Sequence, residues 1–533
     1  MSLVIDRRAL LTIGGFGVAG LLLPGGAVAA QALLSAKGFT HNVASGEPGP
    51  ESMLLWTRYV PAIAGPTKVR VEISDSAEFT KVISGGQMVT GPWRDYTVKI
   101  TASGLLPNTR YHYRFISADG TISPTGRTKT LPIGKTKKFN FAVFSCSNLG
   151  FGHFNAYGHA AARSDIDAVL HMGDYIYEYG SGGYDAGAEF ASRIMPQTEI
   201  FSLADYRMRY ASYRMDADLQ AVHANFPMII IADDHESAND AWEGGAQNHQ
   251  GDEGDWSVRR NAAVQVWREW LPVGEQPWKA YEIGDLATYY RTDTRTSARS
   301  RPPGADTTQT FGEFKAGEWI DDAATMMGSE QEQWLYRQFA RNAARWTIAG
   351  VGTNVGYSYT PKNALDWLAP DTAKSGISYM KRGISSASAG LPNNMDNWGG
   401  YPKARSRLLS AAQRTGANLI MVTGDSHNGR AFNLPEGDKP AGVEFGGHSV
   451  TSPGIDSLTG TTDPKNIARD MVSASPELAW TDTSNRGYMM LSLSHKSATN
   501  EWVFMDSVKS KSLATKPSQF MRVRAGRNVL DAL

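Results

Sequence analysis

Four apolar runs, far apart in the chain, each end just before a side chain that commonly binds metal ions. Residues 139–144 precede Cys146, residues 168–172 precede Asp174, residues 228–231 precede Asp234, and residues 419–422 precede Asp425 and His427. Apolar runs of this length, bounded by Gly or Asp, indicate buried strands, and open α/β sheets bind ligands outside the carboxyl ends of their strands. A single Gly-Asp after a strand is more often a turn, but four such ends predict that they converge on one site.

Length and charge limit the class of protein. A chain of 533 residues is long enough for one large and one smaller domain with an ample core. Lysine plus arginine equals aspartate plus glutamate, at 53 each. Net charge therefore gives no reason to expect nucleic-acid binding, and a local site must attract any anionic substrate.

The amino terminus has the pattern of an export signal. Arg7 and Arg8 precede an apolar stretch that ends near Leu23, and a small-residue run follows at residues 27–30. This order predicts a twin-arginine signal peptide over residues 1–30, export by the twin-arginine machinery, and a periplasmic or secreted protein. The alternative is an uncleaved membrane anchor. No later segment approaches the ~18 apolar residues of a membrane span.

Two regions follow. Residues 38–133 contain short strand patterns at 53–59, 69–73, 96–101 and 111–116, separated by turn residues, which predict a β-sandwich. Residues 105–111 resemble the tyrosine-corner region of fibronectin type III domains. After a linker at 133–138, residues 139–533 alternate strand and helix patterns and predict an α/β domain.

Helical spacing predicts helices over residues 203–219, 261–271 and 331–344. The segments 299–312 and 361–397 are rich in Gly, Pro, Ser and Asn, and we expect long functional loops there.

Cys146 is the only cysteine, so the chain has no internal disulfide. Such a residue is either a small buried hydrophobe or a thiol that is used chemically. Its place after a strand favours the second alternative, and a thiolate selects a transition metal such as iron or zinc.

Three motifs supply further candidates. In residues 173–177, Gly173 permits a tight turn, Asp174 is a candidate bridge between two cations, and Tyr177 is either a phenolate ligand or part of an aromatic core patch. Asp234, with the nearby Asn239, offers oxygen ligands that suit calcium, and the adjacent His235 is a candidate proton donor to a leaving alkoxide.

The third motif is residues 423–429, where Asp425 and His427 flank one residue, so a sharp turn would direct both toward one metal pair. By contrast, His171 lies inside a strand run and is expected to be a core residue.

Taken in order, these motifs resemble the PhoD-type alkaline phosphatases, which are related to purple acid phosphatases. The resemblance extends over nearly the whole mature chain and is carried by residues 39–48, 55–58, 145–147, 173–177, 233–236, 293–295 and 424–427. It implies a four-layer αββα metallophosphatase domain after a small immunoglobulin- or fibronectin-like sandwich, with one ferric ion and one or two calcium ions.

Carried over by position, the resemblance implies a set of metal ligands. Iron would lie among Cys146, Asp174, Tyr177 and His427, with Asp174 bridging. Calcium would lie on Asp234 and Asp425, with Asn239 as a further candidate. His235 matches the position of an acid, and Arg295 either steadies phosphate or pairs with a structural carboxylate.

The predicted function is an exported hydrolase of small phosphomonoesters and phosphodiesters that uses a metal-activated hydroxide. No serine lies in a Gly-x-Ser-x-Gly elbow, so a covalent serine mechanism has no support. One alternative is a phosphodiesterase of phospholipase type. Another is an exported binding protein in which the sandwich is the working part.

Overall fold

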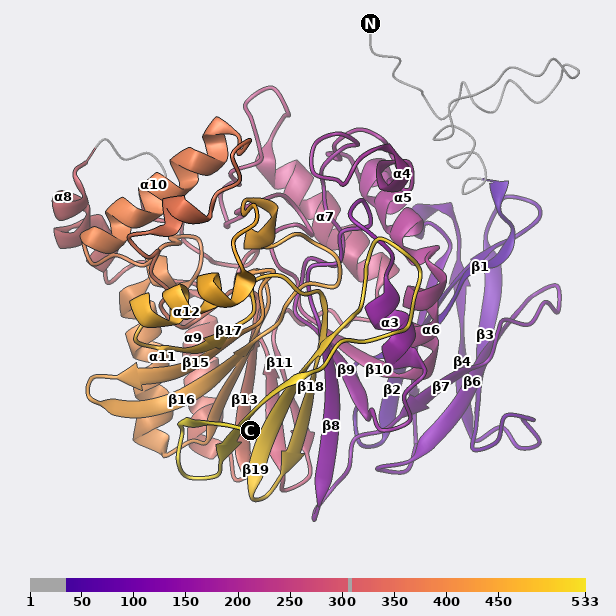
Figure 1. The fold of residues 1–533 in the computed structure, drawn as a ribbon. Coiled ribbons are helices and arrows are strands. Elements are labelled where there is room, and N and C mark those ends of the chain that lie inside the picture. The colour runs from indigo at the N-terminus through magenta and orange to yellow at the C-terminus, as the bar shows by residue number, and fades with distance from the viewer. Residues whose placement is uncertain (1–34, 305–308) are drawn as a thin grey trace, which may run out of the picture.

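Two large β-sheets pack face to face at the centre of the molecule, with helices on both outer sides (Figure 1). The computed structural model describes residues 35–304 and 309–533, so the expected leader at residues 1–30 lies outside the described residues. Within the described part of the chain, no helix is long and apolar enough to span a membrane.

The first sheet has ten strands. In spatial order they are β21 (Leu530–Ala532), β20 (Gln519–Arg524), β19 (Ser497–Phe504), β18 (Gly487–Ser494), β8 (Lys138–Phe144), β9 (Ala168–His171), β10 (Pro227–Ile230), β1 (Gly38–Gly46), β2 (Ser52–Val60) and β5 (Thr97–Ser103). The central strands β8, β9 and β10 are parallel, so their carboxyl ends meet at one edge.

The second sheet has seven strands. In order they are β11 (Lys279–Ile283), β12 (Ala287–Arg291), β13 (Trp346–Val351), β14 (Leu419–Thr423), β16 (Lys439–Gly446), β15 (Arg430–Glu436) and β17 (Leu478–Thr481). Strands β12, β13, β14 and β16 are parallel. All four strands predicted to precede metal-type side chains are confirmed, each within one residue at either end.

Strand β8 shows why the chain forms layers. Side chains alternate between the two faces of a strand, and Phe139, Phe141 and Val143 enter the core between the sheets, whereas Ala142 and Phe144 face the helices. Helices α3 (Asn155–Ala161), α5 (Leu203–Arg214), α6 (Ala217–Asn225) and α7 (Trp256–Trp270) cover the ten-stranded sheet. Helices α9 (Gly328–Arg341), α10 (Lys374–Ser388), α11 (Pro402–Thr415) and α12 (Pro464–Ala474) contribute to the core on the other sheet.

This arrangement confirms the αββα prediction.

The connecting segments contain two short helices and five 3-10 turns within the described residues. The helices are α4 (Ala188–Ala191) and α8 (Phe311–Ala316), and the turns are η1 (Pro92–Arg94), η2 (Glu318–Ile320), η3 (Ala364–Trp367), η4 (Trp398–Gly400) and η5 (Ile455–Ser457).

An all-β unit precedes these layers, as the sequence predicts. A four-stranded sheet of β4 (Ser84–Thr90), β3 (Thr67–Ser74), β6 (Arg110–Ser117) and β7 (Gly126–Lys129) packs on β1, β2 and β5 to form a buried core. The hydroxyl of Tyr111 accepts a hydrogen bond from the Leu106 amide at 2.8 Å, as expected of a tyrosine corner. Strand β1 also pairs in parallel with β10, so one sheet serves both parts of the molecule.

Two helix predictions and one loop prediction need correction. The helix expected over residues 203–219 is two helices, because Asp216 begins a new one: its side chain accepts hydrogen bonds from the amides of Asp218 and Leu219. The helix expected at residue 261 begins at Trp256, capped by Asp255. The segment 361–397, predicted as a loop, contains α10. Its Gly and Ser residues give α10 a low intrinsic helix propensity, and packing against neighbouring residues stabilises it.

Candidate metal centre

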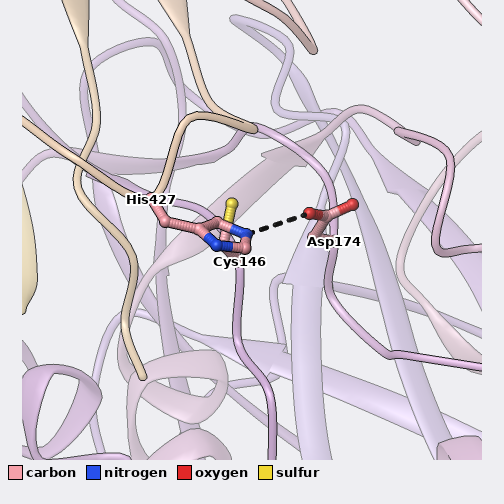
Figure 2. A group of neighbouring side chains, drawn as sticks. All are labelled: Cys146, Asp174 and His427. Carbon is pink, nitrogen blue, oxygen red and sulfur yellow. Dashed lines mark ion pairs between the residues drawn. The ribbon is translucent and has the colours of Figure 1, made fainter. Parts of the chain in front are cut away.

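The carboxyl ends of both sheets bring the predicted metal-type side chains together. One possible ligand atom each of Cys146, Asp174 and His427 lies within 4.8 Å of the others. Figure 2 shows the His427 ring extending toward Asp174, with the Cys146 thiol beside it. The three residues follow β8, β9 and β14, so the predicted convergence of these strand ends is present in the fold.

The backbone at these positions is unusual. Cys146, Asp174, Asp425 and His427 have φ values of 58°, 52°, 62° and 57°. Non-glycine residues in this left-handed region are uncommon, and such conformations concentrate at functional sites because the surroundings must hold them. Gly173, at φ 93°, allows a close approach, since a Cβ there would lie 2.4 Å from the Cβ of Asp233.

Tyr177 and His427 face the same centre. The Tyr177 hydroxyl lies 3.1 Å from Asp174 Oδ2 and 3.2 Å from His427 Nε2. On its other side, His427 Nδ1 lies 2.8 Å from the carbonyl oxygen of Pro453, to which it donates. Burial lowers the pKa of His427 to about 4, so the ring is neutral and its Nε2 carries a free lone pair toward Asp174.

The thiol of Cys146 is fully buried. Burial raises the pKa of Cys146 well above its ordinary value, and the negative charge of Asp174 adds to this effect. Protein atoms alone therefore disfavour a thiolate at this place, and a cation is the partner that would stabilise one.

A second group of carboxylates adjoins the first. Possible ligand atoms of Asp233, Asp234 and Asp425 lie within 4.8 Å of one another, and the same holds for Asp234, Asp240 and Asp396. Burial raises the pKa of Asp425 well above its ordinary value, and repulsion from Asp233 and Asp234 adds to the effect.

Several of these buried oxygens lack partners. Asp174 Oδ1, Asp233 Oδ2 and Asp234 Oδ1 accept no hydrogen bond. Buried carboxylates without compensation are costly. The donor set of carboxylates, imidazole, thiol and phenol, with unsatisfied oxygens directed together, fits bound cations.

Arg295 supplies positive charge inside the cluster and is completely buried. Its Nε donates to Asp233 at 2.5 Å, its Nη1 donates to Asp396 at 2.6 Å, and its Nη2 lies 3.6 Å from Asp234. In this geometry Arg295 pairs with carboxylates of the candidate metal cluster, and its contact with phosphate stays a prediction.

The rings of His235 and Tyr177 lie 4.2 Å apart between centroids. His235 Nδ1 lies 2.7 Å from Glu178 Oε2, and a ring nitrogen lies near Asp174 and Asp234. Burial lowers the pKa of His235, but the charges of Glu178, Asp234 and Asp174 outweigh it, and the net pKa is well above the ordinary value.

The remaining candidates, Asn239 and His171, make their hydrogen bonds with residues outside the cluster. Asn239 donates from Nδ2 to Gln247 at 3.0 Å and from its backbone to Glu178 at 2.8 Å. His171 is fully buried in β9, 2.8 Å from the Tyr157 hydroxyl, which confirms it as a core residue.

Two acidic residues were missed by the sequence analysis. Asp396 comes from the segment predicted as a loop, and no local pattern marks it. Glu178 directly follows the recognised motif at residues 173–177, which is a usable signal. Glu236 accepts hydrogen bonds from the amides of Asp174, Tyr175 and Asp233, and so joins the loops after β9 and β10.

Comparisons with known proteins agree with this architecture. The family model for PhoD-like phosphatase matches residues 141–502, and the model for the N-terminal domain of PhoD-like phosphatase matches residues 26–132. Alkaline phosphatase D of Bacillus subtilis (strain 168) is 31% identical over 490 residues, which cover 84% of this chain and 76% of that protein. The solved structure titled "Structure of PhoD" matches with a TM-score of 0.78 and 27% identity, and the match covers 94% of this chain and 92% of that one.

Fold, acidic centre and relatives together define the class of protein, a phosphoric ester hydrolase. Both family models match in the expected order, and the first covers more than half of the chain. The chain belongs to the PhoD-like phosphatase family.

Proposed function

We propose that this phosphatase is an exported, metal-dependent hydrolase of small phosphomonoesters and phosphodiesters. The observation that carries the proposal is the contrast between the two halves of the buried cluster. One half combines the thiol of Cys146, the phenol of Tyr177 and the imidazole of His427, whereas the other contains only carboxylates.

This contrast supports two kinds of cation. Thiolate and imidazole ligands favour a transition metal, and carboxylates favour calcium or another hard cation. We assign iron to Cys146, Asp174, Tyr177 and His427, and one or two calcium ions to Asp234 and Asp425, with Asn239 as a further candidate. Asp174 has near neighbours in both halves, which supports its role as the bridge.

When bound, the cations would neutralise phosphate oxygens and acidify a water molecule for attack at phosphorus. The chain's own residues orient the reacting groups and supply a proton to the leaving oxygen. Glu178 holds His235 through Nδ1, which leaves the other ring nitrogen to donate a proton to the leaving oxygen. Arg295 fixes Asp233 and Asp396 and limits repulsion among the carboxylates.

The experiment is a measurement of metal content and of hydrolysis of a monoester and a diester by wild type, Cys146→Ala and Asp252→Asn. Asp252 is an exposed carboxylate and serves as the control. We expect iron and calcium in the wild type, loss of iron and of at least about 99% of activity in Cys146→Ala, and no change in the control. A wild type without iron, or a fully active Cys146→Ala, would refute the assignment.

Export and domain division are parts of the same proposal. Residues 1–30 are the twin-arginine leader, residues 38–133 the sandwich domain and residues 139–533 the catalytic domain. The two family models, which end at residue 132 and begin at residue 141, support the division between the last two. Replacement of Arg7 and Arg8 by lysine is expected to retain the folded, metal-loaded protein inside the cell. Unchanged export of the doubly substituted protein would exclude the twin-arginine route.

A further inference from the structure

A cavity of about 230 Å³ opens beside His427. Its walls are the loop after β14, the first residue of β15, residues 453–458, residues 359–367 and α10. Because His427 itself lines the cavity, a substrate with its phosphorus at the proposed metal centre would direct an ester group into this space. The inference rests on the proposed function in that respect.

The cavity wall is about half apolar. Its aromatic and larger aliphatic residues include Tyr359, Trp367, Tyr379, Met380, Ile455 and Leu458. The side chain of Tyr379 is notable because it lines the cavity and yet is 58% exposed, so a ligand can reach its ring. Aromatic rings favour offset or edge-to-face packing with another ring.

The volume limits what the cavity can hold. A cavity of about 150 Å³ is known to hold benzene, so 230 Å³ accommodates one ring with a substituent. Two long acyl chains contain several times as many carbon atoms, and most of their length would remain outside the cavity. Size therefore favours an aryl ester over a diacyl phospholipid.

Two polar side chains in the wall have unsatisfied donors. Arg430 Nε is buried and has no hydrogen-bond partner. Asn428 is 3% exposed; its Oδ1 accepts from the Ile455 amide at 3.3 Å, which fixes the orientation of the amide, and its Nδ2 is buried without a partner. Both atoms are too deeply buried for a ligand to reach, but Arg430 lines the cavity and makes no side-chain hydrogen bond within the described part of the chain, so its positive charge favours a negatively charged oxygen on a ligand.

We propose that this cavity seats the ester group of the substrate and selects a single aromatic ring that carries a negatively charged oxygen, which Arg430 binds. The aromatic side chains recognise the ring, and the guanidinium group recognises its charge. The metal centre determines the reaction, and the cavity determines which ester reacts fastest.

The test compares kcat and KM for phenyl phosphate, carboxy-substituted phenyl phosphates and glycerol phosphate in wild type, Tyr379→Ala, Arg430→Gln and Lys381→Ala. Lys381 is exposed on the same helix as Tyr379 and does not line the cavity, so it is the matched control. Because each variant is compared with wild type on the same ester, the different reactivities of the leaving groups cancel.

We expect Tyr379→Ala to raise KM about tenfold for both aryl esters and by a smaller factor for glycerol phosphate, because only the aryl esters lose ring packing. Arg430→Gln is expected to raise KM for the carboxylated ester by tenfold to a hundredfold relative to phenyl phosphate, the range for a hydrogen bond to a charged group. Equal effects of Tyr379→Ala on aryl and glycerol esters, or none on either, would overturn the proposal.

Calorimetric binding of benzoate separates this proposal from the proposed function, because it needs no hydrolysis. Binding to wild type that weakens in Tyr379→Ala and Arg430→Gln, but not in Lys381→Ala, supports the cavity even if no ester is hydrolysed. Hydrolysis of glycerol phosphate together with no benzoate binding refutes the cavity alone.

Discussion

Replacement of Glu47 by glutamine is expected to destabilise the fold strongly without touching the metal centre. Glu47 follows β1 and reaches across to the second sheet. Its carboxylate accepts hydrogen bonds from Lys279 at 2.9 Å, from Tyr281 at 2.8 Å and from the buried Arg291. It therefore joins the first strand of the chain to β11 and β12.

Two independent estimates give the expected loss of unfolding free energy in Glu47→Gln. Burial raises the pKa of Glu47, but the charges of Arg291 and Lys279 outweigh it and lower the pKa from 4.5 to about 2. At about 1.36 kcal/mol per pH unit, this difference corresponds to about 3 kcal/mol. Removal of one partner from a buried ion pair costs about 3–5 kcal/mol in other proteins.

The sign of the pH dependence is fixed by the lowered pKa. The stabilising contribution of Glu47 is fully present above pH 4.5 and is lost as the pH falls from 4.5 toward 2. The difference in unfolding free energy between wild type and Glu47→Gln should therefore be constant at neutral pH and shrink in that acidic window.

The assay is urea unfolding at several pH values, with Glu51→Gln as the control, because Glu51 is an exposed acid on the same connection. Two results would contradict this prediction. One is a loss of unfolding free energy of less than about 1 kcal/mol in Glu47→Gln at pH 7, and the other is a difference between wild type and variant that does not shrink below pH 4.5.

Three further outcomes are expected. Dialysis against a chelator should lower the midpoint of thermal unfolding, because bound cations stabilise only the folded chain, and an unchanged midpoint would contradict the metal assignment. Glu236→Gln should weaken metal binding tenfold to a hundredfold, as measured by competition with a chromophoric chelator, since an amide cannot accept from all three backbone amides that Glu236 now holds. Tyr111→Phe should lower the free energy of unfolding by about 1 kcal/mol at unchanged activity, because the Leu106 amide loses its acceptor. Tyr113→Phe should lower it by less, because the Tyr113 hydroxyl is buried without a hydrogen-bond partner. Equal losses in the two variants would contradict the role of Tyr111 as a tyrosine corner.

The strands were predictable because their signal is local. Residues 139–144 form a short apolar run of strand length, and in the structure their side chains alternate between two cores. The same locality explains the helix errors. The break at Asp216 depends on a cap that competes with helix continuation, and α10 depends on contacts with distant segments rather than on its own propensity.

The candidate site divides in the same way. Cys146, Asp174, Asp234 and His427 each follow a strand within a few residues, so the sequence alone identifies them and determines that they gather at one edge. Asp396, the pairing of Arg295 with carboxylates, and the cavity beside His427 were decided only by the tertiary structure. The physical reason is that strand ends are positioned by short-range periodicity and hydrogen bonding, whereas long connections acquire their course only when they pack against the finished sheets.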